Sequence, residues 1–250
     1  MLIAADTHVH LYPFYDLALQ FASAHRQLSA AAPGADLLLL CLTERAGQTG
    51  YEALRSGAQT IPGWRVDPAD EPETLWISHP DGRRLAVLAG RQIITRERLE
   101  VLALGRNLRL DDGAPLDAVL ARVREGGATP VLPWGLGKWF GARGRLIRNV
   151  LDTRTPDDVV FADTCLRPSW FPTPAHLRTA RSRGFSILYG SDPLPRPHEE
   201  TLTGQWATLW EADGDASHPA AVWRRIIRDR VSARPAGRRC SMIEALKRLR

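Results

Sequence analysis

The chain has 250 residues, of which 44% are hydrophobic and 24% charged, an ordinary composition for a globular protein with one sizeable core. The formal net charge is +5, from 33 basic and 28 acidic side chains, and no apolar run approaches the roughly 20 residues that span a bilayer. This composition argues against a membrane-spanning chain, and the length fits a single domain over residues 1–250.

The N-terminus and the cysteines indicate the compartment. The first residues, Met-Leu-Ile-Ala-Ala-Asp, lack the basic segment that opens a secretory signal. Three widely spaced cysteines, Cys41, Cys165 and Cys240, include no CxxC pair, which argues against a disulfide framework and a structural zinc site. We therefore expect a cytoplasmic protein without a membrane partner.

Short apolar runs alternate with helical patterns in the first half of the chain. Residues 2–5 are strand-like, and residues 15–28 carry apolar side chains at helical intervals. The leucine-rich run at residues 36–43 has the length of a buried parallel strand. Residues 74–78 and 84–89 flank an Asp-Gly turn, which predicts an inserted β-hairpin.

The second half continues the alternation. Strand-like runs at residues 92–95 and 99–104 precede a helix at 116–125, which ends at a Gly-Gly pair before a strand at 129–132. A strand at 159–162, a helix at 176–183 and a strand at 185–189 follow. Such alternation indicates an α/β architecture, and a barrel-like arrangement fits this length.

A basic segment, which we expect to be helical, covers residues 224–250. Its Arg side chains suit contact with nucleic acid or an acidic partner. However, Val222, Ile226, Ile227 and Val231 recur at roughly helical spacing, which favours a packed helix with a solvated basic face. Nucleic acid is therefore the less favoured partner.

Two histidines stand at the end of the first predicted strand, in Asp6-Thr7-His8-Val9-His10. Side chains two residues apart on a strand point to the same face, about 6 to 7 Å apart along the backbone. Two neutral imidazoles at that spacing can bind one divalent ion. Asp6 shares the face and is expected to orient a ligand. The alternative is a surface pair at a strand end.

Asp192 follows the last predicted strand, in Gly190-Ser191-Asp192. Because functional groups in β/α barrels come from the carboxyl ends of strands, we expect Asp192 to meet His8 and His10 there. A carboxylate at that point can bind a metal ion or accept a proton from a metal-bound water. The alternative is a helix cap, although Pro193 and Pro195 disfavour a long helix.

The order of these segments resembles the PHP (polymerase and histidinol phosphatase) family of metal-dependent phosphoesterases. The opening Asp6-Thr7-His8-Val9-His10 is similar to the family's Asp-x-His-x-His, and the closing Gly190-Ser191-Asp192 to its Gly-Ser-Asp-Ala-His. Between them, Leu42-Thr43-Glu44-Arg45 resembles Thr-Asp-His, and Gly90-Arg91-Gln92-Ile93 resembles Gly-x-Glu-Ile. Residues 99–105 resemble His-Val-Leu-Ala-Leu-Gly, and residues 126–133 resemble a Gly-Gly strand leading to His-Pro. The resemblance implies a distorted (β/α)7 barrel with the hairpin inserted.

Departures from the family pattern reduce the expected metal site. Residues without imidazole stand where the family has histidine, namely Arg45, Glu100, Leu132 and Leu194, and Gln92 replaces its glutamate. His8, His10 and Asp192 carry over as ligands, and Asp16 and Glu100 are possible additions. The resemblance therefore implies a divalent ion, Mn, Zn or Fe, bound singly rather than in a cluster of three.

Lys138 lies in a glycine-rich segment and is one of two lysines in the chain. Gly-rich backbone with Lys and Arg suits an anionic group, so Lys138 and Arg45 are expected to supply positive charge beside the metal. The alternative is a surface loop held down by Trp134, Trp139 and Phe140.

The favoured function is a PHP-like hydrolase of a phosphate ester or another small anionic substrate. In it, a metal-bound hydroxide attacks, Asp192 acts as ligand or proton acceptor, and Arg45 or Lys138 holds the anion. The rival is a catalytically inactive PHP-like domain that binds an anionic ligand or a protein partner. An amidohydrolase-type barrel is a third possibility, but Leu132 occupies its best histidine position.

Overall fold

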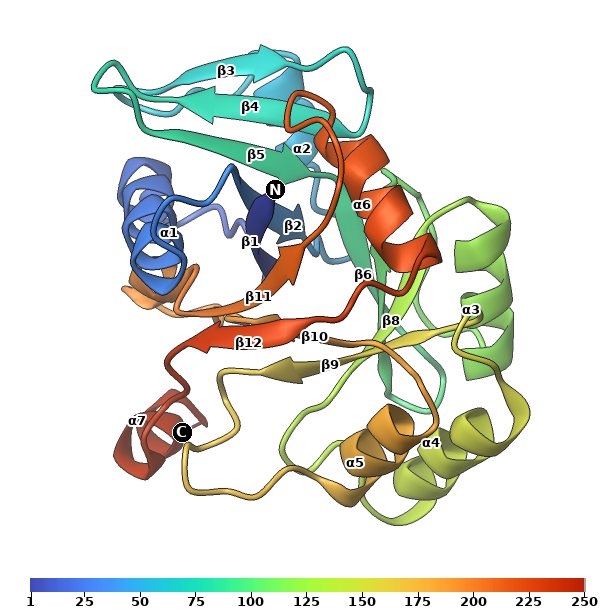
Figure 1. Ribbon diagram of the computed structural model, residues 1–250. Helices are drawn as coiled ribbons and strands as arrows, with labels where there is room; N and C mark the ends of the chain where they lie inside the picture. Colours follow the sequence, from blue (N-terminus) through green and yellow to red (C-terminus); the bar gives the residue numbers. More distant parts are fainter. Residues whose placement is uncertain (250) are drawn as a thin grey trace.

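The computed structural model describes residues 1–249 and contains two mixed β-sheets with helices on their outer faces (Figure 1). The first sheet has seven strands in the order β12-β11-β1-β2-β5-β4-β3, and the second has five in the order β10-β9-β8-β7-β6. The strands are β1 (Leu2–Val9), β2 (Leu37–Leu42), β3 (Arg65–Pro68), β4 (Thr74–Ser78), β5 (Arg84–Leu88), β6 (Gly90–Ile94), β7 (Glu100–Leu104), β8 (Thr129–Pro133), β9 (Val160–Thr164), β10 (Ile187–Gly190), β11 (Trp206–Glu211) and β12 (Arg234–Gly237).

The helices are α1 (Leu17–Ala31), α2 (Gly50–Arg55), α3 (Leu116–Glu125), α4 (Gly141–Thr153), α5 (Ala175–Ser182), the 3-10 helix η1 (Glu199–Leu202), α6 (Pro219–Arg228) and α7 (Met242–Leu249). No helix among residues 1–249 is long and apolar enough to cross a membrane. The helix expected at 116–125 is confirmed as α3.

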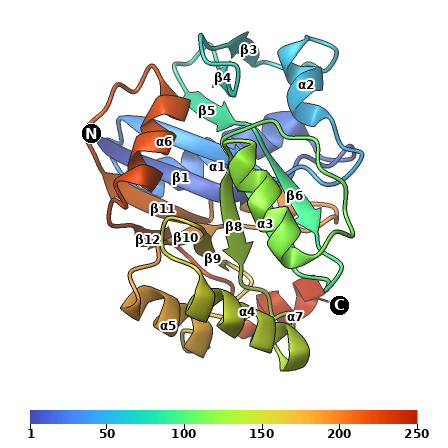
Figure 2. The same ribbon diagram turned by 90° about the vertical axis from the view of Figure 1, so that its right-hand side faces the viewer.

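Three apolar clusters hold the layers together. The first sheet packs against α1 through Phe21, Ala24 and Leu28, each fully buried. The second sheet packs against α3, α4 and α5, which lie together on the face of this sheet that points away from the first sheet (Figures 1 and 2). The third cluster fills the space between the sheets, and α6 adds Trp223 and Ile226 to it. Burying one such side chain is worth about 1.5–3 kcal/mol, so these faces decide the arrangement of the layers.

The expected distorted (β/α)7 barrel is wrong, because the strands of residues 1–249 form two mixed sheets and no closed barrel. Among the named strands of residues 1–249, parallel ladders run only through β1–β2–β5 and β8–β9–β10. Elsewhere β11 runs antiparallel to β1, and β6, β7 and β8 pair antiparallel in succession. These antiparallel pairings interrupt the β-α repetition from which an all-parallel barrel is built.

The predicted pairing of the hairpin strands is confirmed, since β4 and β5 run antiparallel across the Asp-Gly turn. Its expected place as an insertion into a barrel is wrong, because β5 also pairs in parallel with β2. The hairpin is therefore part of the first sheet. The leucine run is β2, a parallel strand between β1 and β5, as its apolar composition predicts.

The basic segment at 224–250 is not one helix. Helix α6 ends at Arg228, and Arg230 adopts a left-handed backbone conformation that stops it. Strand β12 follows and pairs antiparallel with β11, and α7 comes after it. Arg250 lies outside the described residues.

The two sheets approach each other where β1, β2, β6 and β10 meet. Thr7 Oγ1 donates to the Tyr189 carbonyl at 3.0 Å, and the Asp192 amide donates to the His8 carbonyl at 3.0 Å. Gly190 permits this approach, since a Cβ there would lie 2.6 Å from the His8 nitrogen. On the other side, Glu44 beyond β2 forms a parallel bridge with Arg91 of β6. The carboxyl ends of β1, β2 and β10 therefore come together beside β6.

Candidate metal centre

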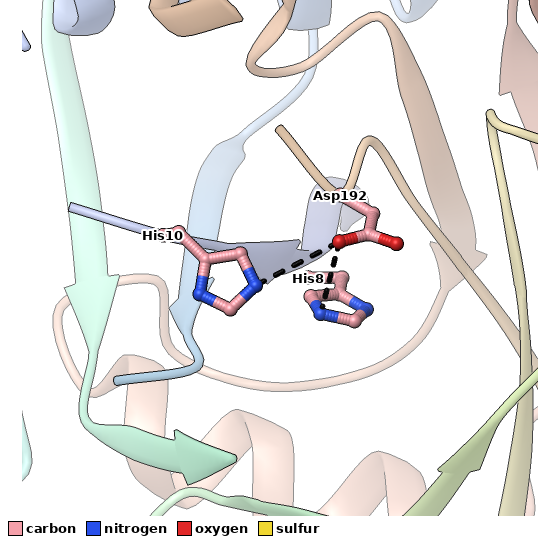
Figure 3. Close-up of side chains that lie close together, drawn as sticks. All are labelled: His8, His10 and Asp192. Carbon is pink, nitrogen blue, oxygen red and sulfur yellow. Dashed lines mark ion pairs between the residues drawn. The ribbon is translucent and has the colours of Figure 1, made fainter. Parts of the chain in front are cut away.

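His8, His10 and Asp192 lie together at this junction, from the end of β1 and the segment after β10 (Figure 3). Asp192 Oδ1 lies 3.4 Å from His8 Nε2 and 3.7 Å from His10 Nε2. One ligand atom from each of the three side chains lies within 4.8 Å of the others. The histidine side chains are 2% and 3% exposed and that of Asp192 is 15% exposed, so the group opens to solvent at the carboxylate.

Thr43 sets the orientation of His10. Its hydroxyl donates to the Val9 carbonyl at 3.0 Å, which leaves the Thr43 oxygen as an acceptor for the His10 Nδ1–H at 3.4 Å. The proton of the neutral ring then sits on Nδ1, and the lone pair of Nε2 faces Asp192. An outer hydrogen bond of this kind is what fixes the tautomer of a metal-binding histidine.

Gln92 lies beside His8. From the sequence it was noted only as a replacement of the PHP family's glutamate. Its Oε1 lies 3.3 Å from His8 Nε2, on the same nitrogen that faces Asp192. An amide oxygen has lone pairs and no charge, and it binds hard divalent ions in many proteins. His8 Nδ1 is buried and has no hydrogen-bond partner among residues 1–249. Only Nε2 of His8 is therefore engaged by its surroundings.

The charge of the group follows from its burial. Desolvation lowers the pKa of His10 from its usual 6.5 and is only partly offset by the neighbouring Asp192 carboxylate, so the ring is neutral near pH 7. Burial opposes ionisation of Asp192 too, but His8, His10 and Lys138 together hold its pKa well below the usual range. The Asp192 carboxylate and the Nε2 atoms of both imidazoles thus face one another in a nearly dry space.

These residues fit a divalent ion. Ligand atoms bound at about 2.0–2.1 Å around a tetrahedral ion lie about 3.3 Å apart. The separations of His8 Nε2 and His10 Nε2 from Asp192 Oδ1, 3.4 and 3.7 Å, are close to that value. An ion would also neutralise the charge of the Asp192 carboxylate.

Asp6 supports the site through hydrogen bonds to Ser191 and Gly204. Its fully buried carboxylate accepts hydrogen bonds from the Ser191 amide at 2.9 Å, the Gly204 amide at 2.7 Å and the Ser191 hydroxyl. Burial raises the pKa of Asp6 to about 6, against the lowering effect of these hydrogen bonds. Asp6 therefore ties β1 to the segment that carries Asp192.

Asp192 itself has a left-handed backbone, with φ of 51°. Such a conformation is unfavourable for residues other than glycine and persists where the surroundings enforce it. The hydrogen bond from the Asp192 amide to His8 supplies part of that constraint.

The other residues predicted for the site are Asp16, Glu100, Lys138 and Arg45, and each has a different environment. Asp16 is the N-cap of α1, where its Oδ1 accepts the Leu19 amide at 3.0 Å, which is a structural task. Glu100 forms an ion pair with Lys138, and both carry charge close enough to affect the site. Arg45 is exposed and lies near the Tyr12 hydroxyl. The structure therefore groups Glu100 with Lys138 rather than with the histidines.

A row of aromatic rings that sequence reasoning missed leads outward from the histidines. Successive centroids along His8, His10, Tyr12 and Phe14 are 5.1, 5.3 and 5.6 Å apart. The Tyr12 ring is buried and stacks on Phe14, which is 54% exposed. The alternation of aromatic residues at 8, 10, 12 and 14 was the available signal.

Comparison with solved structures identifies the fold. PsfC from Pseudomonas syringae PB-5123 superposes with a TM-score of 0.51 and 18% identity, over 92% of this chain and 98% of that chain. PfuEndoQ, a lesion-specific endonuclease from Pyrococcus furiosus, gives 0.54 and 11%, over 94% of this chain. Endonuclease Q in complex with a 27-mer duplex substrate containing an abasic lesion gives 0.52 and 11%, also over 94%. This chain spans 58% of both Endonuclease Q chains.

At these identities the likeness establishes a shared fold. No protein-family model matches the sequence, and no curated protein is similar to it. Membership of the PHP family therefore stays a prediction.

Proposed function

We propose that this protein is a metal-dependent hydrolase of phosphate esters that holds a single divalent ion with His8, His10 and Asp192. One observation carries the proposal: the imidazole Nε2 atoms face one carboxylate oxygen at 3.4 and 3.7 Å inside a nearly dry junction. A cation bound there would be held by the charge of the carboxylate and by one imidazole nitrogen from each histidine. The ion's identity, among Mn, Zn and Fe, is left to measurement.

A divalent ion bound there supplies Lewis acidity, which polarises a phosphoryl oxygen and makes a water molecule more acidic. The protein's own residues have separate tasks. His8 and His10 present lone pairs, and Thr43 keeps that of His10 in place. Asp192 directs Oδ1 at both imidazoles, while its other oxygen points away from them and can accept a proton from an attacking water (Figure 3).

Lys138 and Arg45 provide the positive charge that a phosphate ester needs at the mouth of the site. The Lys138 side chain is 39% exposed, and its charge is close enough to favour the ionised form of Asp192. Its ion pair with Glu100 has to loosen when a phosphate oxygen takes over as partner. Arg45 is free of such a pair among residues 1–249, and its fork of donors suits two phosphate oxygens.

A nucleic acid is the second candidate substrate, and two observations favour it. The similar Endonuclease Q structures are those of a lesion-specific endonuclease and of a complex with a duplex substrate. The exposed face of Phe14, two rings beyond His10, also offers a stacking surface for a base next to the scissile phosphate. A small phosphate ester without a base would not use Phe14.

Hydrolysis of a chromogenic phosphodiester and a phosphomonoester with added Mn²⁺ tests the proposal. We expect Asp192→Asn to lower kcat at least about 100-fold, because it removes both a ligand and the proton acceptor. Asp16→Asn is the matched control and should keep full activity, since asparagine also caps a helix. Equal activity of wild type and Asp192→Asn would reject the hydrolase and leave the inactive, ligand-binding domain as the better account.

A further inference from the structure

Two cysteines that are 75 positions apart in the sequence face each other near the candidate site. Cys165 follows β9 and Cys240 precedes α7, and their Sγ atoms lie 3.7 Å apart, both buried. The Cys240 amide donates to the Cys165 carbonyl at 2.9 Å, so the two backbones lie side by side. Neighbouring backbones of this kind allow a disulfide after a small movement of the side chains. The third cysteine, Cys41, is in the core between the sheets.

A buried arginine joins this sulfur pair to Asp192. Arg248 Nη1 lies 3.0 Å from each sulfur, and its Nη2 donates to the Asp192 carbonyl at 3.0 Å. The same guanidinium pairs with Glu199, whose Oε2 accepts the Leu194 amide at 2.9 Å. The Arg248 side chain therefore contacts both sulfurs. It also contacts both ends of the segment 192–199, through the Asp192 carbonyl and the Glu199 carboxylate.

The sulfur pair makes a second connection to that segment. The Cys165 thiol donates to the Ser191 carbonyl at 3.0 Å, directly before Asp192. Removing the thiol hydrogen would therefore remove a hydrogen bond at Ser191 and change what Arg248 faces.

The charge around the sulfurs favours reaction with an oxidant. The hydrogen bond with Cys165, together with the Arg248 guanidinium, lowers the pKa of Cys240 against the effect of burial. The same hydrogen bond and burial raise the pKa of Cys165. One thiolate beside one thiol is the combination that forms a disulfide most readily. The short helix α7 carries Arg248, which contacts both sulfurs, so local opening of α7 would admit a small oxidant.

We propose that Cys165 and Cys240 are a peroxide-oxidised dithiol whose state is transmitted through Arg248 to the segment that carries Asp192. The Cys240 sulfur attacks a peroxide oxygen, the O–O bond breaks, and the departing hydroxide takes up the proton that Cys240 has lost. The Cys165 sulfur then attacks the Cys240 sulfenic acid, the S–O bond breaks, and the hydroxyl leaves as water with the Cys165 proton. In total, two thiols and hydrogen peroxide yield a disulfide and two waters.

Thiol counting on the reduced wild-type protein tests the chemical step. After brief treatment with hydrogen peroxide and denaturation, we expect free thiols to fall from three to one, with a cross-linked Cys165–Cys240 peptide that dithiothreitol reverses. Cys41→Ala should fall from two thiols to none, and Cys240→Ala should give no intramolecular cross-link. Three remaining thiols, or a sulfinic acid on one cysteine without a cross-link, would overturn the proposal. The wild-type measurement stands without any variant.

Hydrogen exchange tests the transmission and needs neither metal nor substrate. Oxidation should speed exchange of the Leu194 amide about tenfold, the weight of one hydrogen bond, because the segment loses the Cys165 hydrogen bond to the Ser191 carbonyl and Arg248 loses its contacts with the thiols. The Cys240→Ala protein should show no change with peroxide. A cross-link that forms while residues 190–199 exchange unchanged would refute the link through Arg248. Because this readout ignores divalent ions, it is independent of the proposed hydrolase.

Discussion

The Thr43 hydroxyl lies 3.4 Å from His10 Nδ1 and 3.0 Å from the carbonyl of Val9, so two adjacent strand ends share one hydrogen-bonding unit. This contact makes His10 a lone-pair donor toward Asp192 rather than a proton donor. Thr43 thus acts on the site through His10 and is not a ligand of the proposed ion. A variant without its hydroxyl therefore tests the orientation of the His10 ring while all three ligands remain.

Thr43→Val should weaken divalent-ion binding about tenfold, because losing an outer hydrogen bond frees the tautomer and the ring orientation of His10. Thr43→Ser keeps the hydroxyl and should retain most of the affinity. Isothermal titration with Mn²⁺ or competition with a chelator measures both variants. Equal affinity of the valine variant and the wild type would show that His10 is oriented by something else.

The metal-free protein should show a His10 that stays neutral below pH 6.5. The sign follows from burial, which disfavours the charged ring, so protonation requires a lower pH than for an ordinary histidine. NMR titration of the imidazole resonances, assigned with a His10→Ala variant, measures this directly. A midpoint at or above 6.5 would mean that the carboxylate of Asp192 outweighs the burial of the ring.

Gln92→Glu should tighten divalent-ion binding about tenfold, because it places a second carboxylate beside His8 Nε2 and raises the ligand charge. The same variant should melt at a lower temperature without metal, since it buries an additional charge. Gln92→Leu is the opposite control and should weaken binding. Melting curves with and without Mn²⁺ report both effects, and identical curves for the glutamate variant and wild type would place Gln92 outside the site.

Gly190→Ala should destabilise the fold by about 2 kcal/mol, a fall in Tm of roughly 4–8 °C for a chain of this size. The added Cβ would meet the His8 nitrogen at 2.6 Å and press β10 away from β1. Gly34→Ala is a useful comparison, because its Cβ meets nothing within 4 Å and only the positive φ opposes it. A smaller loss at Gly190 than at Gly34 would contradict the close approach of the two strands.

The parts of the structure that the sequence predicts are those with a local signal. The leucine run, the Asp-Gly hairpin and the helix at 116–125 each carry periodicity or turn chemistry within a few residues. The His8 and His10 pair is visible for the same reason. Asp192 was found through its place after a strand and through the family resemblance.

The parts that could not be predicted depend on partners distant in sequence. The antiparallel pairing of β11 with β1 joins segments far apart in the sequence, and antiparallel pairs of this kind stand where the expected barrel would have parallel ones. Asp16 was considered a ligand, yet the start of α1 uses it as a cap. Likewise, nothing near Cys165 indicates that Cys240 and Arg248 lie beside it.

Metal content tests the central claim most directly. The wild-type protein, purified after supplementation with Mn, Zn or Fe, should hold close to one divalent ion per chain by elemental analysis. The variant with His8→Ala and His10→Ala should hold essentially none, with Asp16→Asn retaining the wild-type content. Two or three ions per wild-type chain, or equal content in wild type and the double variant, would contradict a single-ion centre at His8, His10 and Asp192.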